Sequence, residues 1–307
     1  MTPPQPPVRG RPRPMRSQIA VRRAIALAFM AVLVGLLAWA GIFVLGKIRD
    51  RRAAPPPVTT APPPPKPFRV VFPEGFTRAE MAKRVTAVDR IAHRERGVTP
   101  RLDARAYLRL TASSPLPGRF AEDGKRRALE GFLFPATYDF TARTTTRQLV
   151  NAQLTAFQRA WNGIDLTYAR SKNLTPYDVL IVASMVEKET LAPDERRLVA
   201  AVIYNRLHAR MPLGIDATIR YALHVPGTES LHQSQLNNPT PYNTRLHAGL
   251  PPTPIASPGL ASLQAAAHPA KVNYLYFVRK PDKVHHFFTA SYTAFQNYAK
   301  AHGYKPG

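Results

Sequence analysis

The stretch TPYDVLIVASMVEKET, at residues 175–190, decides how the chain folds. Thr175 is a good cap residue, and Pro176 and Asp178 suit the first and third positions of a helix that begins there. When the following residues are placed at about 100° each, the apolar ones point nearly all round the axis. A helix of this kind is buried on most sides. The segment therefore predicts the central helix of a packed domain.

Two glutamates, Glu187 and Glu189, stand near the end of this apolar helix. They lie about 200° apart around the axis, so they cannot share one cleft. A glutamate in this position has two explanations. It can pair with a cation, for which Arg196, Arg197 and Arg206 are candidates, or burial can raise its pKa and keep it protonated as a general acid. The helix pattern leaves both explanations open.

The remaining soluble sequence predicts an α+β fold. A Thr-x-x-Glu capping box at Thr77 and Glu80 opens a short helix, and residues 86–128 look irregular apart from a helix at 104–112. Hydrophobic periodicity and capping signals predict further elements. The helices are expected at 145–161, 193–208, 213–223, 260–267 and 292–301, and the strands at 68–72, 273–278 and 285–289.

Two other segments have features that bear on function. Residues 130–138, EGFLFPATY, are dense in aromatic side chains and form either a core strand or a shelf on which sugar rings stack. Residues 249–259 are rich in proline, and a rigid loop of this kind holds binding residues in place.

The N-terminal region contains one candidate membrane segment. Residues 24–46 lack any charge, and a helix of that length crosses a hydrocarbon core of about 30 Å. A cleaved signal peptide is the alternative, although its apolar region is usually shorter. Arginines are more numerous before the segment than lysines and arginines after it, which favours a cytoplasmic N-terminus. Residues 47–67 then form a proline-rich, extended linker.

The composition limits the chemistry that the chain can perform. The 307 residues carry a net charge of +24 and no cysteine, so disulfides and thiolate metal sites are excluded. A basic chain suits an anionic partner such as nucleic acid, lipid or an acidic wall polymer, but scattered charge is also typical of a basic proteome. The sequence lacks the helix or platform patterns of nucleic-acid binding, and no HExxH, phosphate loop or GxSxG occurs. We therefore expect no metal, no cofactor and no nucleic acid.

Seven segments, in order along the chain, carry a family resemblance. They are EGFLFPATY (130–138), ASMVEKET (183–190), ERRLVAAVIYNRL (195–207), YNT (242–244), GLPPTPIASPGLASLQAAAHPAK (249–271), YLYFV (274–278) and His285-x-Phe287. Together they resemble the endolytic murein transglycosylases, the YceG-like or MltG-type family. The resemblance implies a lyase that cleaves the MurNAc-GlcNAc β-1,4 bond of peptidoglycan, leaves a 1,6-anhydro-MurNAc end and limits the length of nascent glycan strands.

The resemblance also implies which residues form the site. The catalytic glutamate of the family falls on Glu189, and the substrate-binding candidates are Asp216, Thr218, Tyr242, Asn243 and His285. For His285 a structural role remains open, and His285 and His286 should face opposite sides of a strand. The family often has Gln where Gly214 stands and Gly where Val284 stands, which puts the register of the substrate in doubt.

The residue patterns and the resemblance together predict a domain order and a location. The order is a cytoplasmic basic tail (1–23), a transmembrane helix (24–46), the linker (47–67), a small LysM-like module with a connecting region (68–128) and a catalytic domain (129–307). The location is the inner or plasma membrane, single-pass, with the catalytic domain outside the cytoplasm. Its partners are glycan strands and peptidoglycan synthases of elongation or division. A non-catalytic wall-binding scaffold and a hydrolytic muramidase are the rival functions.

Overall fold

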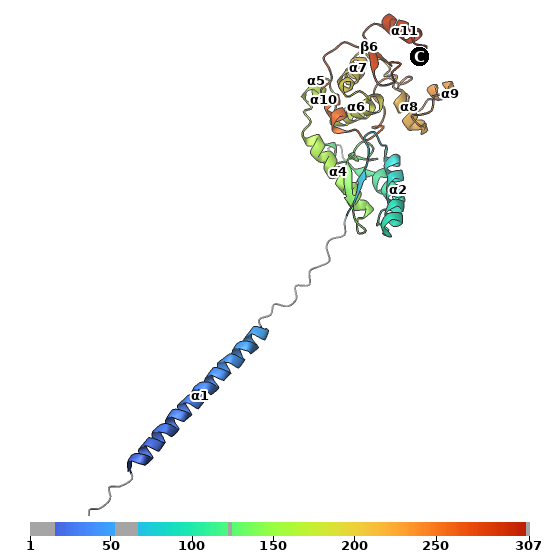
Figure 1. Cartoon of the computed structure of the whole chain (residues 1–307). Coiled ribbons are helices and arrows are strands. Elements are labelled where there is room, and N and C mark those ends of the chain that lie inside the picture. The colour runs from blue at the N-terminus through green and yellow to red at the C-terminus, as the bar shows by residue number, and fades with distance from the viewer. Residues whose placement is uncertain (1–15, 53–66, 122–124, 305–307) are drawn as a thin grey trace, which may run out of the picture. The chain divides into compact units, whose positions relative to one another are not determined.

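The N-terminal unit consists of one long helix. The computed structural model describes residues 16–52, 67–121 and 125–304, and the chain separates into the units Met1–Pro64 and Pro65–Gly307 (Figure 1). Helix α1 (Arg16–Arg52) contains an apolar span, Val21–Ile48, of 28 residues whose side chains are all exposed. At about 1.5 Å per residue this span exceeds a hydrocarbon core of roughly 30 Å. It fits a membrane anchor or a signal sequence.

Helix α1 is longer than the membrane segment expected from the sequence. It contains the expected span 24–46 and continues to Arg52, so the first part of the expected 47–67 linker is helical. Most of the expected basic tail and residues 53–66 of the linker lie outside the described residues.

The second unit is α+β, as the sequence predicts. Its first half contains β1 (Phe68–Val71), α2 (Arg78–Arg96), α3 (Ala104–Ala112), β2 (Ser114–Pro115), a short 3-10 helix (Gly118–Ala121), β3 (Arg126–Arg127), β4 (Thr137–Phe140) and α4 (Thr146–Asn162). Its second half contains α5 (Thr167–Ser171), α6 (Pro176–Glu189), a 3-10 turn (Pro193–Glu195), α7 (Arg196–His208), α8 (Asp216–Leu223), α9 (Gln233–Leu236), α10 (Leu260–Ala267), β5 (Tyr276–Arg279), β6 (His286–Thr289) and α11 (Tyr292–Ala301).

The strands of the described residues form three antiparallel pairs, β1 with β4, β2 with β3, and β5 with β6. The first pair sets Val70 opposite Tyr138, and therefore crosses the boundary expected between residues 128 and 129. That boundary and the LysM-like character of the small module stay predictions.

Helix α2 is longer than the sequence suggested. Thr77 and Glu80 form the predicted capping box, but the helix continues to Arg96 and ends at Gly97, which is left-handed with φ +62°. Val85, Val88 and Ala92 are buried along one face. This spacing of three and four residues is a helical signal, which the many charged residues around it obscured.

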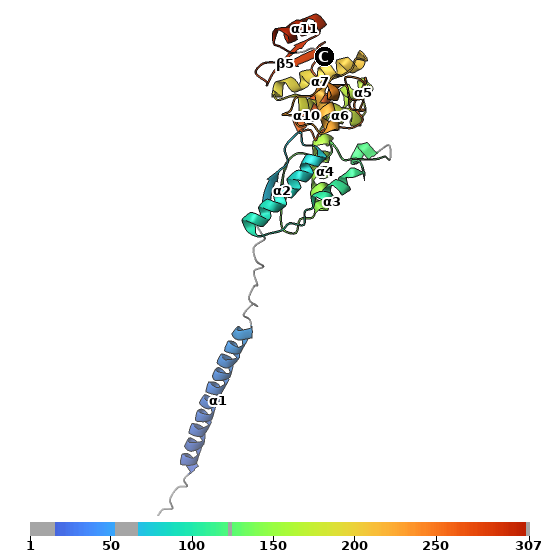
Figure 2. The ribbon, with the colours of Figure 1, turned by 90° about the vertical axis from the view of Figure 1, so that its right-hand side faces the viewer.

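Helix α6 is the centre of the core. Its capping box at Thr175 has the predicted form, and every residue from Val179 to Val186 is buried. Helices α7 and α10 pack against it, and the two views show these three helices together (Figures 1 and 2). The aromatic segment 130–138 is also core, because Phe132 and Leu133 are fully buried and the ring of Phe132 meets that of Phe120 edge-on at 4.9 Å. The sugar-stacking alternative for Phe132 is therefore wrong.

Substitution of Gly131 should destabilise the second unit strongly. Gly131 has φ +85°, and an added Cβ would lie 2.7 Å from Cβ of Pro254. We expect Gly131→Ala to lower the free energy of unfolding by about 1–2 kcal/mol for the left-handed backbone and about 1–3 kcal/mol more for the clash. Gly97→Ala is the matched control, since the backbone of Gly97 is also left-handed but no atom lies within 4 Å of an added Cβ. Urea unfolding checks both, and equal losses would contradict the role of the clash.

Candidate active site

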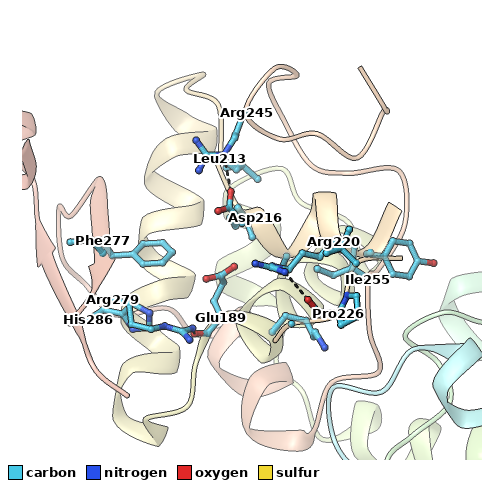
Figure 3. Close-up of a pocket in the computed structure, with 18 of the residues that line it drawn as sticks. Glu189, Leu213, Asp216, Arg220, Pro226, Arg245, Ile255, Phe277, Arg279 and His286 are labelled. Carbon is cyan, nitrogen blue, oxygen red and sulfur yellow. Dashed lines mark hydrogen bonds and ion pairs between the residues drawn. The ribbon is translucent and has the colours of Figure 1, made fainter. Parts of the chain in front are cut away.

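A cleft of about 980 Å³ runs along the C-terminal end of α6 (Figure 3). Its walls come from the N-terminal turn of α2, from α8 and the loop after it, from the β5–β6 hairpin and from α11. The cleft therefore gathers segments from both halves of the second unit. Clefts of this size that combine apolar walls with a few polar groups are the usual sites of ligand binding.

Glu189 enters this cleft from the last position of α6. The helix is buried up to Val186, and its final residues emerge at the wall, so Glu189 is only partly buried. In Figure 3 its carboxylate points into the cleft, toward Asp216 and the guanidinium group of Arg220. Nη2 of Arg279 donates a hydrogen bond to the backbone carbonyl of Glu189 at 3.1 Å. The end of the helix is therefore fixed, while the carboxylate stays accessible to a ligand.

The surroundings of Glu189 favour its protonated form. Burial, followed by the negative charge of Asp216, raises the pKa of Glu189 to about 6. The charges of Arg279 and Arg220 and the backbone amide of Ala217 act in the opposite direction. At pH 7 roughly a tenth of the molecules carry the proton. A pKa this close to neutrality suits a general acid that must also act as a base.

The cation-pairing explanation for Glu189 is not supported. Among the described residues no salt bridge reaches its side chain. Nε of Arg197 donates to the carbonyl of His268, and Arg206 donates to the carbonyls of Leu275, Pro212 and Leu213.

Glu187 lies on the opposite side of α6, as its helical spacing predicts. Its carboxylate accepts a hydrogen bond from the backbone N–H of Gly259 at 3.0 Å. The carboxylate of Glu74 lies against Gly259, and burial together with the charge of Glu187 raises the pKa of Glu74. Glu187 thus supports the loop that precedes α10 and is absent from the cleft.

Asp216 lines the cleft together with Glu189. Nε of Arg245 donates to its carboxylate at 2.7 Å, and this pair is partly exposed. Arg245 follows the YNT segment directly, and no motif pointed to its part in the site. The pair keeps the negative charge of Asp216 beside Glu189.

Three other predicted site residues lie behind the cleft wall. The hydroxyl of Thr218 is buried and donates to the carbonyl of Ile215 at 2.7 Å. The amide of Asn243 is also buried and donates to two loop carbonyls. The hydroxyls of Tyr242 and Thr253 are 2.8 Å apart. These side chains hold the loops around α8, and none of the three lines the cleft.

The two adjacent histidines take different places. His285 is exposed in the turn before β6, and its Nδ1 lies 3.0 Å from the carboxylate of Asp282. His286 lines the cleft and is almost fully buried, and its Nδ1 donates to the carboxylate of Glu195 at 2.7 Å. Burial lowers the pKa of His286. Of these two histidines, His286 lines the cleft and His285, the residue that the resemblance indicated, does not.

A second buried carboxyl at the cleft, Glu130, escaped the sequence analysis. It accepts hydrogen bonds from the backbone N–H of Arg78 at 2.9 Å and from the hydroxyl of Tyr221 at 3.2 Å. Burial raises its pKa to about 7. Glu130 is the first residue of the EGFLFPATY segment. A charged residue beside so many apolar ones was the feature of the sequence that could have indicated a functional carboxyl here. It joins the first turn of α2 to α8.

A model of the YceG-like family matches residues 48–301. The chain belongs to the YceG-like family. This match covers α2 to α11, and so includes every residue that lines the cleft except Tyr304.

Individual relatives share this region. The chain is 39% identical over 163 residues to a protein of Streptococcus pneumoniae named endolytic murein transglycosylase. The aligned region covers 51% of the chain and 29% of that protein. The chain is 31% identical over 220 residues to a protein of the same name from Bacillus subtilis. This aligned region covers 69% of the chain and 59% of that protein. A crystal structure of a YceG-like protein from Listeria monocytogenes superposes with a TM-score of 0.58 at 25% identity, over 76% of each chain.

Removing the charge of Asp216 should lower the pKa of Glu189. The negative charge of Asp216 favours the proton on Glu189, and Asp216→Asn removes that charge while Arg279 and Arg220, whose positive charges oppose the proton, remain. We expect the titration of Glu189, followed by carbon NMR of labelled glutamate, to move below pH 6. Asp139→Asn is the control, since Asp139 pairs with Arg69 on β1, away from the cleft. An unchanged or higher pKa in Asp216→Asn would refute the electrostatic account.

Proposed function

We propose that this YceG-like protein is an endolytic peptidoglycan lytic transglycosylase in which Glu189 is the single acid/base. The observation that supports this most is the carboxyl of Glu189, which lies in a large cleft with a pKa of about 6 and no salt-bridge partner among the described residues. The pneumococcal and Bacillus relatives carry the name of this activity.

The reaction needs one residue to give a proton and then take one. Protonated Glu189 gives its proton to the oxygen that links MurNAc to GlcNAc, and the glycosidic C–O bond breaks. The resulting carboxylate accepts the proton of the muramyl C6 hydroxyl, whose oxygen bonds to the anomeric carbon. A 1,6-anhydro ring forms, the chain is cut, and Glu189 ends in its starting state. No water is consumed, so a second carboxylate is not needed to activate one.

Asp216 supports both halves of this cycle. Positive charge develops on the sugar ring as the bond breaks, and the carboxylate of Asp216 favours that charge electrostatically. The same carboxylate raises the pKa of Glu189. Arg245 holds Asp216 in place through their 2.7 Å contact.

The proposed cellular setting follows from α1. Its apolar span crosses a bilayer, and the larger number of arginines on the N-terminal side favours a cytoplasmic N-terminus with the cleft outside. In that place the enzyme would act on nascent strands beside peptidoglycan synthases and limit the length of those strands.

Glu189→Gln should abolish cleavage while the fold and glycan binding persist. Loss of the acid/base group lowers the rate by about 10²–10⁴-fold. The measurement is digestion of purified sacculi by the full chain in detergent, with product masses read by mass spectrometry. An anhydro end is lighter by one water than a hydrolytic end, so the masses separate a lyase from a muramidase.

Glu187→Gln is the matched control for this experiment. It lies two positions away on the same helix but faces the loop at Gly259, and we expect its rate to stay within a few-fold of the native one. A native cleavage rate in Glu189→Gln would show that another residue is the acid, whereas no cleavage by the native chain would favour a scaffold over an enzyme.

The cleavage rate should fall as the pH rises through about 6. The pKa of Glu189 is raised, so the acid form dominates below this value and is lost above it. We expect kcat to decrease by about tenfold for each pH unit well above the pKa. In Asp216→Asn the decrease should begin at a lower pH. A rate that rises between about pH 5 and pH 8 would contradict Glu189 as the acid.

A further inference from the structure

Three aromatic rings form a cluster at the end of the cleft bounded by the β5–β6 hairpin and α11. The centroid of Tyr276 lies 5.4 Å from those of both Tyr292 and Phe295, and the rings of Tyr292 and Phe295 are stacked at 6.2 Å. The guanidinium of Arg206 covers Tyr276 at 5.3 Å, while it is held by three backbone carbonyls. All three rings line the same cleft as Glu189. We call this cluster the aromatic platform.

Strand β5 connects the platform to the end of α6. Tyr276 begins the strand, and Arg279, which donates to the backbone carbonyl of Glu189, ends it. Three residues of extended strand span about 10 Å. Because alternate residues of a strand face opposite sides, Tyr276 and Arg279 lie on different faces of β5, and the platform lines the cleft apart from Glu189.

The packing of α11 against the hairpin leaves one ring of the platform, that of Tyr292, exposed. Tyr292 is 48% exposed although it lies in the first turn of a folded helix. On another side of that helix the ring of Tyr298 stacks on Phe287 at 4.3 Å and almost parallel, at 5°, and Tyr298 does not line the cleft. This stack and the contacts of Tyr276 with Tyr292 and Phe295 hold α11 on the hairpin, and the part of the Tyr292 ring that stays exposed borders the cleft. An aromatic ring left exposed in a cleft marks a binding surface.

We infer that the aromatic platform of Tyr276, Tyr292 and Phe295 is a saccharide subsite that holds a sugar ring of the glycan strand away from the bond that is cut. A pyranose ring presents a flat face of C–H groups, and aromatic faces stack against such apolar surfaces. The rings carry no charge, so the subsite recognises the sugar backbone and not the acidic groups of peptide stems. The inference rests on the proposed function, since it assumes that the cleft accepts a glycan.

A subsite of this kind has a consequence for how the strand is cut. Contacts beyond the sugars at the reacting bond favour a strand that extends along the cleft over one that ends at Glu189. Binding energy from such remote sugars also orients the reacting bond. The platform thus gives a physical reason for cleavage within a strand.

Binding of glycan strands to platform variants tests the inference. The probe is peptide-free strands released from sacculi by amidase, titrated by calorimetry into the full chain in detergent, with Glu189→Gln present to prevent cleavage. We expect Tyr292→Ala to weaken binding by about three- to tenfold, the worth of one aromatic contact. Tyr292→Phe keeps the ring and should bind within about twofold of the parent.

Tyr298→Ala is the matched control. It removes a tyrosine from the same helix, and it disturbs the packing of α11 more than Tyr292→Ala does, since Tyr298 stacks on Phe287. Binding should stay at the parental level. Equal weakening by Tyr292→Ala and Tyr298→Ala, or parental binding in Tyr292→Ala, overturns the subsite.

The outcomes separate the subsite from the proposed function. If the native chain cleaves sacculi but Tyr292→Ala binds strands like its parent, only the subsite is wrong. If strands bind through Tyr292 but the native chain cleaves nothing, the subsite stands and the lyase assignment fails. If the native chain neither binds nor cleaves, both are overturned.

Discussion

The structure depends on the burial of α6 up to its last turn, where Glu189 leaves the core. An apolar helix that is covered on all sides lies in one defined position, so its final residue is placed as firmly as the core itself. Arg279 holds the backbone carbonyl of Glu189, and α8 brings Asp216 and Arg220 to the carboxylate. The packing that stabilises the fold therefore also shields this carboxyl in part from water, and this burial is the main cause of its raised pKa.

Most arginines around the cleft donate hydrogen bonds to backbone carbonyls and do not form ion pairs. Arg206 donates to three carbonyls, Arg220 to that of Pro226, and Arg279 to that of Glu189. A guanidinium has several donors, so it can fasten loops that lack regular secondary structure. The net charge of +24 is thus a weak guide to the ligand, because these cations are already engaged. A neutral sugar backbone suits such a cleft as well as an anionic polymer does.

The two halves of the second unit share one core and meet at the cleft. Glu130 accepts from the first turn of α2 and from Tyr221 of α8, while Gly75 and Phe76 exchange backbone hydrogen bonds with Ser257. The β1–β4 pair ties the start of this unit to the segment before α4. Movement of β1 and α2 relative to α6 would therefore disturb the cleft. This explains how a short α/β segment far from Glu189 in sequence contributes to the site.

The sequence by itself determined most of the helices and, within each of them, which residues share a face. Capping boxes and periodicity placed α3, α6, α10 and α11, and helical spacing put Glu187 and Glu189 on opposite sides of α6, because these signals are local. Only the tertiary structure decided which polar residues reach the cleft. Thr218 and Asn243 are buried away from the cleft, and His286 lines the cleft whereas His285 does not. Periodicity gives the face on which a side chain lies, whereas the segment that covers that face comes from elsewhere in the chain.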